Sequence, residues 1–317
     1  MTRVLVTPRS LTRAPGPEVQ RLEAAGLEVV LGPAGQMPTE DELLALVPGC
    51  AGWLAGVEPI GRRVLEAADA LRIISRNGAG VDNVDAEAAR ERGIAVARTP
   101  GANARGVAEL AIALVLSGLR HVPAMSRAIA DGRWERTLGG EALGRTLGVI
   151  GTGAIGREVL SLGAALGMRT VASDPYAPDD LVAAGVPFLS VDELLERADV
   201  VTLHCPPPEG RALIGAGELA RAKDGLVLVN TARAALVDEA AVLAALDDGR
   251  LGAFATDVFA VEPPAPTPLL AHPRTIATPH VGGYTRESVA RAGGGAVDNL
   301  LAVLAPEHPS HEQRTER

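Results

Sequence analysis

The sequence is poor in cysteine, lysine and aromatic residues. Its two cysteines, Cys50 and Cys205, are too few for a disulfide framework or a structural zinc site, so we expect a cytoplasmic protein without a metal centre. Lysine occurs once, at Lys223, and arginine supplies nearly all of the positive charge. Only 2% of the residues are aromatic, so the core is expected to consist of alanine, valine and leucine.

Charge and hydropathy exclude two further classes of protein. The formal net charge of −9 disfavours general nucleic-acid binding, and no basic run is interleaved with aromatic residues. Although 47% of the residues are hydrophobic, no apolar stretch reaches the roughly 20 residues that cross a bilayer.

The run Met1–Val6 begins directly as a strand and lacks the layout of a signal peptide. A chain of 317 residues suits one large or two ordinary domains.

Short strand-like runs alternate with helical patterns along most of the chain, which predicts parallel sheets covered by helices. In the first hundred residues the expected strands are Val4–Thr7, Leu27–Leu31, Ala51–Ala55, Leu71–Ser75 and Ile94–Ala97. The second set is Leu147–Ile150, Arg169–Ser173, Val186–Leu189, Val200–His204, Leu226–Asn230, Gly252–Thr256 and Thr275–Ala277. The two sets predict two α/β units.

Capping signals mark several helix boundaries. Thr39 followed by Glu42 is a capping-box pattern and predicts a helix that begins near Thr39. A second helix is expected to begin near Asp85 and to end at Gly93. A third is expected over Asp238–Asp248.

Two longer helices bear on how the chain is assembled. The stretch Ala104–Leu119 is apolar on most faces, so it must be buried, either inside the chain or against a second subunit. We favour a subunit interface, with burial inside the chain as the alternative. The final helix, about Arg286–Leu304, follows the last strand and is placed to cross back onto the first unit. The charged tail Pro306–Arg317 is expected to fray.

The segment Gly151–Gly156 reads GTGAIG and lies between the strand Leu147–Ile150 and a periodic apolar helix. This strand, turn and helix favour a dinucleotide site over a plain glycine turn. Gly151 permits the turn, Gly153 lets the backbone approach a pyrophosphate, and Gly156 lets helix and strand pack closely. The pyrophosphate would bind free N–H groups at the positive end of the helix.

Asp174 follows the next strand at close to the expected distance of roughly 20 residues from the glycines. A carboxylate there accepts hydrogen bonds from the adenosine ribose hydroxyls and repels a 2′-phosphate. Pro175 and Tyr176 come next and offer no cation that would hold such a phosphate. The alternative is a surface aspartate without a ligand. The pattern predicts NAD(H) rather than NADP(H).

Arg233, Glu262 and His280 each follow one of the last three predicted strands, at the edge where open α/β sheets bind ligands. A guanidinium binds a carboxylate through two hydrogen bonds, and a carboxylate beside an imidazole favours its protonated form. Taken singly, a surface cation, a solvated turn and a loop histidine explain them. Together, beside a nucleotide site, they predict hydride transfer to a 2-keto acid. His204 and Cys205 end another strand and are interpreted as backbone lining near the nicotinamide ribose.

The chain resembles the D-isomer-specific 2-hydroxyacid dehydrogenases over nearly its whole length. The matching segments are Asn77–Asp85, Thr99–Asn103, the GTGAIG segment, Asn230–Arg233, Asp257–Phe259 with Glu262-Pro263, and Thr278–Gly283. The resemblance implies two doubly wound parallel-sheet α/β domains. A Rossmann-type NAD-binding domain, residues 99–283, is inserted into a flavodoxin-like substrate domain built from residues 1–98 and 284–317. It also implies a cleft between the domains and a homodimer, which we expect to form through Ala104–Leu119.

Residue by residue, the resemblance implies that Arg233, Glu262 and His280 are catalytic. The resemblance and the spacing of the glycines and Asp174 together predict a set of NAD-binding positions. These are Gly151, Gly153, Ala154, Ile155, Gly156, Asp174, Cys205, Thr231, Ala232, Arg233, Asp257, His280 and Gly283. The substrate-binding positions are Arg76, Asn77, Gly78, Ala79 and Arg233. No metal, nucleic acid or membrane partner is expected.

The expected reaction is hydride transfer between NAD(H) and a D-2-hydroxy acid/2-keto acid pair. Arg76 and Arg136 are candidate phosphate cations, so 3-phosphoglycerate is considered beside hydroxypyruvate and glyoxylate. The alternatives are an NAD-sensing corepressor-like binding protein and a phosphite dehydrogenase. The C-terminal regulatory domain of long phosphoglycerate dehydrogenases is not expected.

One position departs from the family pattern. Ala234 and Ala235 follow Arg233, where the family usually has glycine. If that turn requires a positive φ, alanine would cost about 1 kcal/mol and tilt Arg233. The expected consequence is a lower efficiency without a change of fold.

Overall fold

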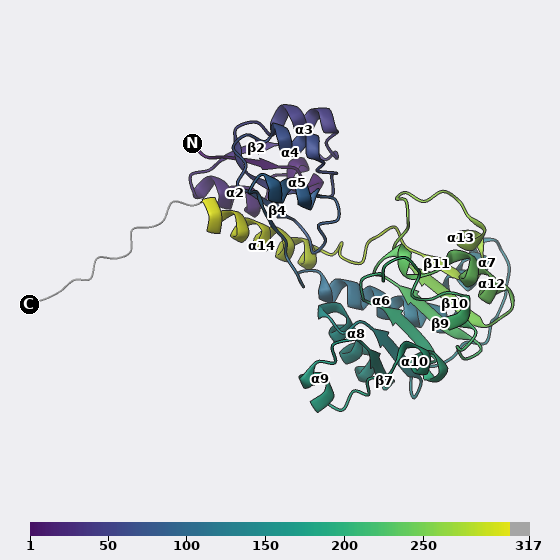
Figure 1. Ribbon diagram of the computed structural model, residues 1–317. Helices are drawn as coiled ribbons and strands as arrows, with labels where there is room; N and C mark the ends of the chain where they lie inside the picture. Colours follow the sequence, from purple (N-terminus) through teal and green to yellow (C-terminus); the bar gives the residue numbers. More distant parts are fainter. Residues whose placement is uncertain (305–317) are drawn as a thin grey trace, which may run out of the picture. The chain divides into compact units, whose positions relative to one another are not determined.

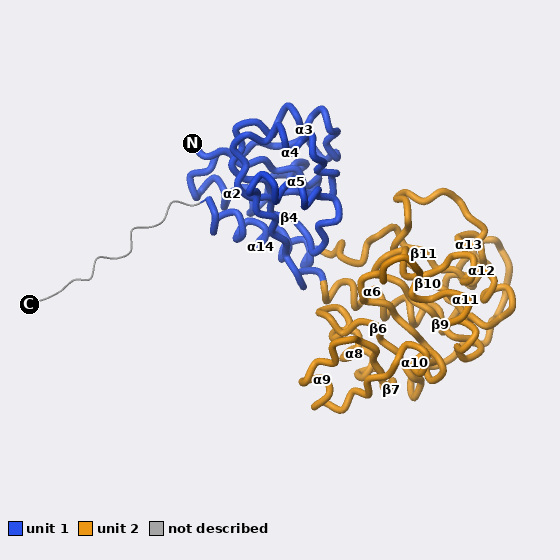
Figure 2. The backbone as a smooth tube through the Cα atoms, viewed as in Figure 1, with its two compact units in different colours: residues 1–103, 286–317 blue, residues 104–285 orange. Residues whose placement is uncertain are grey.

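The computed structural model describes residues 1–304, which form two α/β units (Figure 1). Unit 1 contains Met1–Asn103 and the chain from Arg286 onward, and unit 2 contains Ala104–Thr285 (Figure 2). The boundaries expected from the resemblance, 98/99 and 283/284, lie a few residues earlier in the chain. The predicted tail Pro306–Arg317 lies outside the described residues.

Unit 1 contains a five-stranded parallel sheet in the order β2-β1-β3-β4-β5. Its strands are β1 (Arg3–Val6), β2 (Glu28–Leu31), β3 (Cys50–Ala55), β4 (Ile73–Arg76) and β5 (Ala95–Ala97). This is the strand order of the flavodoxin-like fold. Each strand predicted in this part of the chain is present, with small shifts at its ends.

Helices cover both faces of the unit 1 sheet. On one face lie α3 (Glu40–Leu46), α4 (Arg62–Ala67) and α5 (Ala86–Glu91), and on the other α1 (Arg9–Arg13), α2 (Pro17–Ala24) and α14 (Arg286–Leu304). The predicted capping box at the start of α3 is present, since the Glu42 N–H donates to Thr39 Oγ1 at 3.3 Å and the Thr39 N–H donates to the Glu42 carboxylate at 2.7 Å. The final helix α14 packs against β3 and β4, so the chain does return to the first unit.

Unit 2 contains a six-stranded parallel sheet in the order β11-β10-β9-β8-β6-β7. Its strands are β6 (Thr146–Ile150), β7 (Arg169–Ser173), β8 (Val200–Leu203), β9 (Leu226–Asn230), β10 (Leu251–Thr256) and β11 (Thr275–Ala277). The predicted strand Val186–Leu189 is reduced to one parallel bridge between Ala172 and Phe188. Pro187 has no N–H, so a longer ladder cannot form there. With this bridge beside β7, the order is that of a Rossmann fold.

Two helical layers enclose the unit 2 sheet. One consists of α6 (Ala104–Leu119) and α8 (Ala154–Ala165), and the other of α10 (Val191–Arg197), α11 (Ala216–Leu219), α12 (Glu239–Asp247) and α13 (Pro268–Ala271). Three short elements complete the unit: α7 (Val122–Ala130), α9 (Asp179–Ala183) and the 3₁₀-helix η1 (Ala234–Leu236). Alternate residues of β9 face the two layers, since Val227 and Val229 pack towards α6 while Leu226 and Leu228 pack the other way.

Helix α6 is buried inside unit 2. Ala108, Ala111 and Val115 are fully buried in the core shared with α8, β9 and β10. Burial within the chain therefore accounts for its apolar composition, which no longer argues for the subunit interface that we favoured. Within residues 1–304 no single helix has the length and apolar content of a membrane span, and α6 and α7 meet that criterion only together across a 67° bend.

Candidate active site

The glycine-rich turn connects β6 to α8 and leaves backbone N–H groups open. Gly151 has φ +94°, and a Cβ there would lie 2.6 Å from the carbonyl group of His204 at the end of β8. A Cβ at Gly156 would lie 1.9 Å from the carbonyl oxygen of Gly151, so helix and turn can approach only through glycine. Gly153 is the N-cap of α8, makes no side-chain cap and has open space where a Cβ would stand. The helix begins with the exposed Ala154 and the half-buried Ile155.

Asp174 lies directly after β7 and receives three hydrogen bonds. Its Oδ2 accepts from the Thr152 N–H at 2.7 Å and from the Thr152 hydroxyl at 2.8 Å, and its Oδ1 accepts from the Tyr176 N–H at 2.9 Å. Partial burial would raise the pKa of Asp174, but these donors outweigh it, so the pKa lies below its usual value. The carboxylate is therefore ionised at neutral pH.

Two buried polar atoms at the carboxyl ends of β8 and β9 lack hydrogen-bond partners. They are His204 Nδ1 and Thr231 Oγ1. The other ring nitrogen of His204, Nε2, lies 2.9 Å from Thr202 Oγ1, and burial lowers the pKa of His204 to about 3. The ring is neutral, which suits a lining residue better than an acid/base. Cys205 follows as a half-buried thiol whose pKa is raised by burial.

These features fit a dinucleotide. The open helix terminus suits a pyrophosphate, the ionised Asp174 suits ribose hydroxyls, and the two orphaned atoms can be satisfied by a ligand over β8 and β9. NAD would be held by this set. Within residues 1–304, no group of three or more His, Cys, Asp and Glu side chains is arranged to hold a metal ion.

Arg233 is carried by a turn that Asn230 shapes. Asn230 is fully buried at the end of β9; its Nδ2 donates to the Arg233 carbonyl at 2.8 Å and its Oδ1 accepts from the Ala232 N–H at 3.1 Å. The exposed Arg233 guanidinium donates from Nη1 to the Ala232 carbonyl at 2.8 Å. Sequence reasoning did not single out Asn230, although a buried polar residue at the end of an apolar strand was the available signal.

The alanines after Arg233 cause no backbone strain. Ala234 and Ala235 lie in η1, and Arg233 itself is extended with φ −145°. Among residues 1–304, the non-glycine residues with positive φ are His121 and His280. The expectation that alanine would tilt Arg233 was conditional on a positive φ, and this condition is not met.

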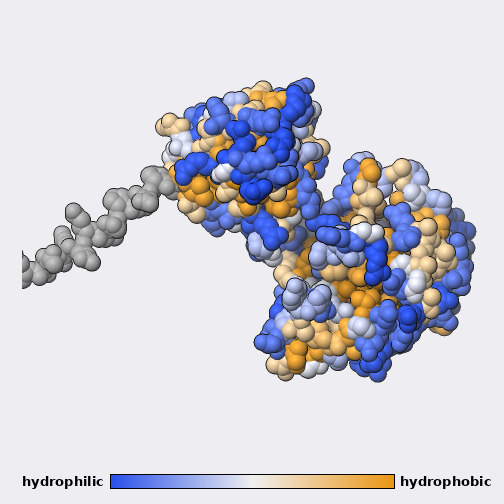
Figure 3. All heavy atoms as spheres, viewed as in Figure 1, coloured by the Kyte–Doolittle hydropathy of each residue, from blue (hydrophilic) through white to orange (hydrophobic). Residues whose placement is uncertain are grey.

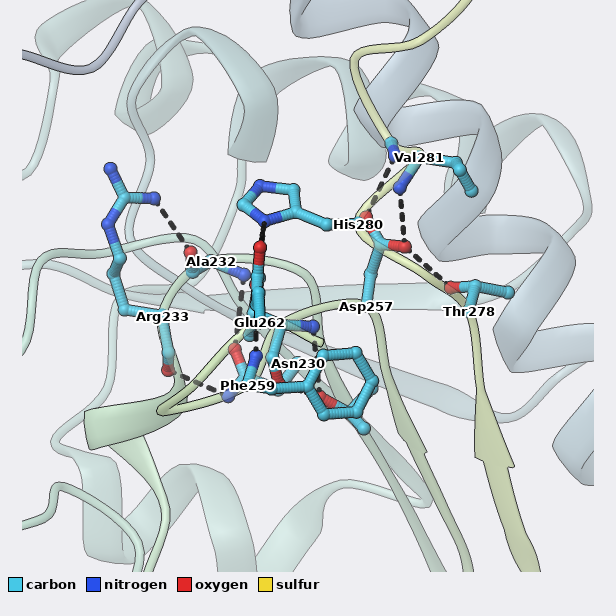
Figure 4. A network of polar contacts seen from close by, with 12 residues as sticks. Asn230, Ala232, Arg233, Asp257, Phe259, Glu262, Thr278, His280 and Val281 are labelled. Atoms are coloured by element: carbon cyan, nitrogen blue, oxygen red, sulfur yellow. Dashed lines mark hydrogen bonds and ion pairs between the residues drawn. The ribbon is translucent and has the colours of Figure 1, made fainter. Parts of the chain in front are cut away.

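His280 and Glu262 are directly hydrogen-bonded (Figure 4). His280 Nδ1 lies 2.8 Å from Glu262 Oε1 and 2.9 Å from Oε2, so Nδ1 donates and Nε2 is left for other chemistry. The Phe259 N–H also donates to Glu262 Oε1, at 3.3 Å. The side chains of His280 and Glu262 are 52% and 40% exposed, so a ligand can reach the imidazole.

Asp257 holds the turn from which His280 projects. It is buried, its Oδ1 accepts from the Thr278 hydroxyl at 2.6 Å and the Val281 N–H at 2.9 Å, and its Oδ2 accepts from the Gly282 N–H at 2.8 Å. His280 itself has φ +53°, a left-handed conformation that an ordinary side chain adopts only where neighbours enforce it. The assignment of Asp257 and Gly283 as NAD-binding positions, which the resemblance implies, stays a prediction.

The structure brings Arg233, Glu262 and His280 together at the carboxyl ends of β9, β10 and β11. In Figure 4 the guanidinium of Arg233 and the ring of His280 project away from the strands, with Glu262 beneath the ring. The glycine-rich turn lies at the same edge of the same sheet, after β6. A cation, an acid/base pair and a nucleotide turn therefore share one edge of unit 2.

The substrate-binding candidates of unit 1 form one loop after β4. Arg76 donates to the Asn77 carbonyl and, at 3.4 Å, to Asn83 Oδ1. A Cβ at Gly78 would lie 2.7 Å from Arg76 Nη1, so glycine lets this guanidinium lie along its own loop, before the half-buried Ala79. Burial lowers the pKa of Arg76, and the nearby carboxylates of Glu58 and Asp82 partly offset this effect.

The second phosphate candidate, Arg136, lies elsewhere. It belongs to unit 2, in the exposed segment Arg133–Gly140 that follows α7 and has no regular secondary structure. Arg76 belongs to unit 1. The two cations that the sequence suggested for a phosphate are thus carried by different units.

The fold and the site define a dinucleotide-binding α/β protein with an arginine and a histidine–glutamate pair beside the nucleotide turn. Residues 112–282 match the family model described as D-isomer specific 2-hydroxyacid dehydrogenase, NAD binding domain. The chain belongs to this family, and unit 2 carries its NAD-binding domain.

Known relatives and solved structures agree with this assignment. A D-3-phosphoglycerate dehydrogenase of Mycobacterium tuberculosis is 40% identical over 275 residues, which cover 85% of this chain and 52% of that protein. A hydroxypyruvate reductase of Thermotoga maritima is 38% identical over 272 residues, 84% of this chain and 88% of that protein. The crystal structure of the TT0316 protein of Thermus thermophilus matches with a TM-score of 0.86 and 40% identity, over 96% of this chain and 97% of that one. The chain spans about half the length of the D-3-phosphoglycerate dehydrogenases that it matches.

Proposed function

We propose that the chain is an NAD-dependent oxidoreductase that interconverts a D-2-hydroxy acid and the corresponding 2-keto acid. The observation that carries the proposal is the Glu262–His280 pair at 2.8 Å, on the same sheet edge as Arg233 and the nucleotide turn. Bound NAD(H) supplies or accepts the hydride. The chain's own residues bind the acid, orient it and move one proton.

Arg233 binds the substrate. Its guanidinium is exposed and planar, and it can hold the carboxylate of a 2-keto acid through two hydrogen bonds while one N–H polarises the neighbouring carbonyl. Asn230 fixes the backbone on both sides of this residue, so the direction of the side chain is set before the substrate arrives. A lysine would offer the charge without this planar geometry.

His280 moves the proton. Nδ1 is engaged by Glu262, so Nε2 is the atom that gives a proton to the developing alkoxide in reduction and takes the hydroxyl proton in oxidation. Glu262 accepts a hydrogen bond from Nδ1 and fixes the plane of the ring, as the carboxylate partner of a catalytic histidine commonly does. Asp257 holds the left-handed turn that aims the ring.

The substrates we propose are 3-phosphoglycerate or the hydroxypyruvate and glyoxylate group, in keeping with the names of the relatives. Arg76 is the cation that the resemblance assigns to the distal group of the substrate. Its guanidinium is already engaged by the Asn77 carbonyl and by Asn83 Oδ1, and the nearby carboxylates of Glu58 and Asp82 oppose the approach of a further anion. This favours a substrate with an uncharged distal group over one with a phosphate dianion.

The test is a spectrophotometric assay of NADH with glyoxylate, hydroxypyruvate, 3-phosphohydroxypyruvate, pyruvate and, in the other direction, phosphite. We expect turnover with at least one 2-keto acid. His280→Ala should lower kcat by about 100- to 10,000-fold, the usual contribution of a general acid/base. His272→Ala, which alters a histidine outside the site, is the matched control. Undiminished turnover in His280→Ala contradicts the proposed mechanism, and NADH binding without turnover of any keto acid contradicts the proposed function.

A further inference from the structure

We propose that Thr152, the second residue of the GTGAIG segment, is a positioning residue that orients Asp174 and thereby sets the preference for NAD(H) over NADP(H). The inference rests on the proposed cofactor. It adds a residue that neither the spacing of the glycines nor the acidic position identifies, because the residue at this place in such a segment can be of any type.

The Thr152 hydroxyl is aimed at the carboxylate that follows the neighbouring strand. Its distance to Asp174 Oδ2 is 2.8 Å, and the backbone N–H of the same residue lies 2.7 Å from the same oxygen. Thr152 is only 2% exposed, so its side chain is enclosed by the turn and cannot rotate freely to other partners. One residue thus holds one oxygen of Asp174 through two hydrogen bonds.

The acceptor capacity of Asp174 shows what this arrangement leaves for a ligand. A carboxylate has about four acceptor positions, two on each oxygen. Thr152 occupies both positions of Oδ2, and the Tyr176 N–H occupies one of Oδ1. One position of Oδ1 remains, and a ribose hydroxyl can fill it. Because Thr152 is enclosed, it acts through Asp174 and does not itself touch the cofactor.

The charges around Asp174 make its orientation decisive for a 2′-phosphate. The nearest basic residue along α8, Arg157, is bound to Asp180 with Nη2 3.0 Å from Oδ1, so it is engaged elsewhere. A carboxylate that is fixed and ionised beside the ribose repels a 2′-phosphate electrostatically. Without the Thr152 hydroxyl, Asp174 keeps only the two backbone donors, Thr152 N–H and Tyr176 N–H, so its carboxylate is held less firmly, which weakens both the hydrogen bond to NADH and the repulsion of NADPH.

Fluorescence titration of the whole protein with NADH and with NADPH gives both dissociation constants without any substrate. Thr152→Val keeps the shape of the side chain and removes the hydroxyl, and Thr152→Ser keeps the hydroxyl. Because the hydroxyl acts on the cofactor only through Asp174, we expect Thr152→Val to weaken NADH binding by at most about tenfold and to change NADPH binding by less than about threefold, so that the ratio of the two constants shifts towards NADPH. The ratio of the two constants should be restored in Thr152→Ser.

A purely structural role for Thr152 makes a different prediction. In that case Thr152→Val lowers the Tm and weakens both cofactors equally, so the ratio of their dissociation constants stays unchanged, and this result overturns the inference. Should Thr152→Val fail to fold, Thr152→Ala is measured by the same ratio. If the unaltered protein does not bind NADH, the proposed function fails; if it binds NADH and the ratio is insensitive to the hydroxyl, only this inference fails.

Discussion

His280 combines a left-handed backbone with an exposed side chain, and such a residue keeps its conformation only if its neighbours are fixed. Here the fixing group is Asp257, whose two oxygens accept from Thr278, Val281 and Gly282 on both sides of the histidine. Removing this carboxylate would cost more stability than the net contribution of its hydrogen bonds, because it would leave its donors without an acceptor. The position of the His280 ring, the proposed acid/base, therefore depends on a second residue, Asp257.

Asp257→Asn tests this dependence. The asparagine amide presents an N–H donor where a carboxylate oxygen accepted a hydrogen bond, so the turn should shift. The imidazole of His280 would then be misaligned with the substrate. We expect kcat to fall by up to about 100-fold, the effect of a displacement of about 1 Å, with a change in the NADH dissociation constant of less than about threefold. A large loss of NADH affinity with unchanged kcat would show instead that Asp257 serves the cofactor, as the resemblance implied.

His204 gives the stability of the fold a pH dependence. Burial lowers its pKa from 6.5 to about 3, so between these values the unfolded chain binds a proton that the folded chain does not. Stability is therefore lost as the pH falls through 6.5, by about 1 kcal/mol at pH 5.5. The lowered pKa values of Asp174 and Asp199 act only below about 3.8 and do not disturb this window.

Urea unfolding at pH 7.5 and 5.5 measures this effect. In His204→Gln the loss between the two values should be smaller by about 1 kcal/mol than in the unaltered protein. His272, whose pKa burial also lowers, contributes equally to both proteins and cancels in the comparison. An identical pH dependence in the two proteins would show that the ring of His204 accepts a proton without unfolding.

Secondary structure was the part of the fold most accessible from the sequence. The strand Leu226–Asn230 has the bounds expected of it, because a parallel strand buried on both faces is a nearly continuous apolar run. The less buried strand Arg169–Ser173 also has its predicted bounds. The exception, Val186–Leu189, contains Pro187, and a proline removes the donor that an edge strand needs to extend its ladder. The capping residues Thr39, Asp85 and Asp238 correctly marked the starts of α3, α5 and α12.

Some residues of the candidate site could also be predicted from the sequence, and others could not. Arg233, Glu262 and His280 follow strand ends, so local pattern is enough to place them on one edge of the sheet. Asn230, Thr152 and Thr278 were not recognised as supporting residues, because their partners lie elsewhere in the chain or depend on the conformation of a turn. Periodicity carries no information on which hydroxyl meets which carboxylate.

At the scale of the whole molecule, the surface is a mixture of polar and apolar side chains (Figure 3). Some of the most exposed large apolar residues lie in one segment after α7, where Trp134 is 84% and Leu138 97% exposed. Exposed apolar side chains that lie close together in one segment are typical of interaction surfaces, and α6 is already buried inside unit 2. We propose that a second copy of the chain covers this segment in a homodimer.

Light scattering of the purified protein measures this directly. We expect a dimer for the unaltered chain and a shift towards the monomer in Leu138→Asp, since a buried carboxylate without a partner is costly. Val182→Asp, an exposed apolar position on α9, is the control and should leave the dimer intact. A monomeric unaltered chain would contradict the homodimer.

The return of α14 to unit 1 has a consequence for synthesis. Val297, Leu300 and Leu304 cover one face of a sheet whose strands all lie before Ala104, whereas unit 2 is built from one uninterrupted stretch. A ribosome therefore releases every part of unit 2 before the helix that seals unit 1. A nascent chain, or one cut short by a stop codon after Thr285, would leave the part of this apolar sheet face that α1 and α2 do not cover exposed, and would become a target for chaperones and proteases.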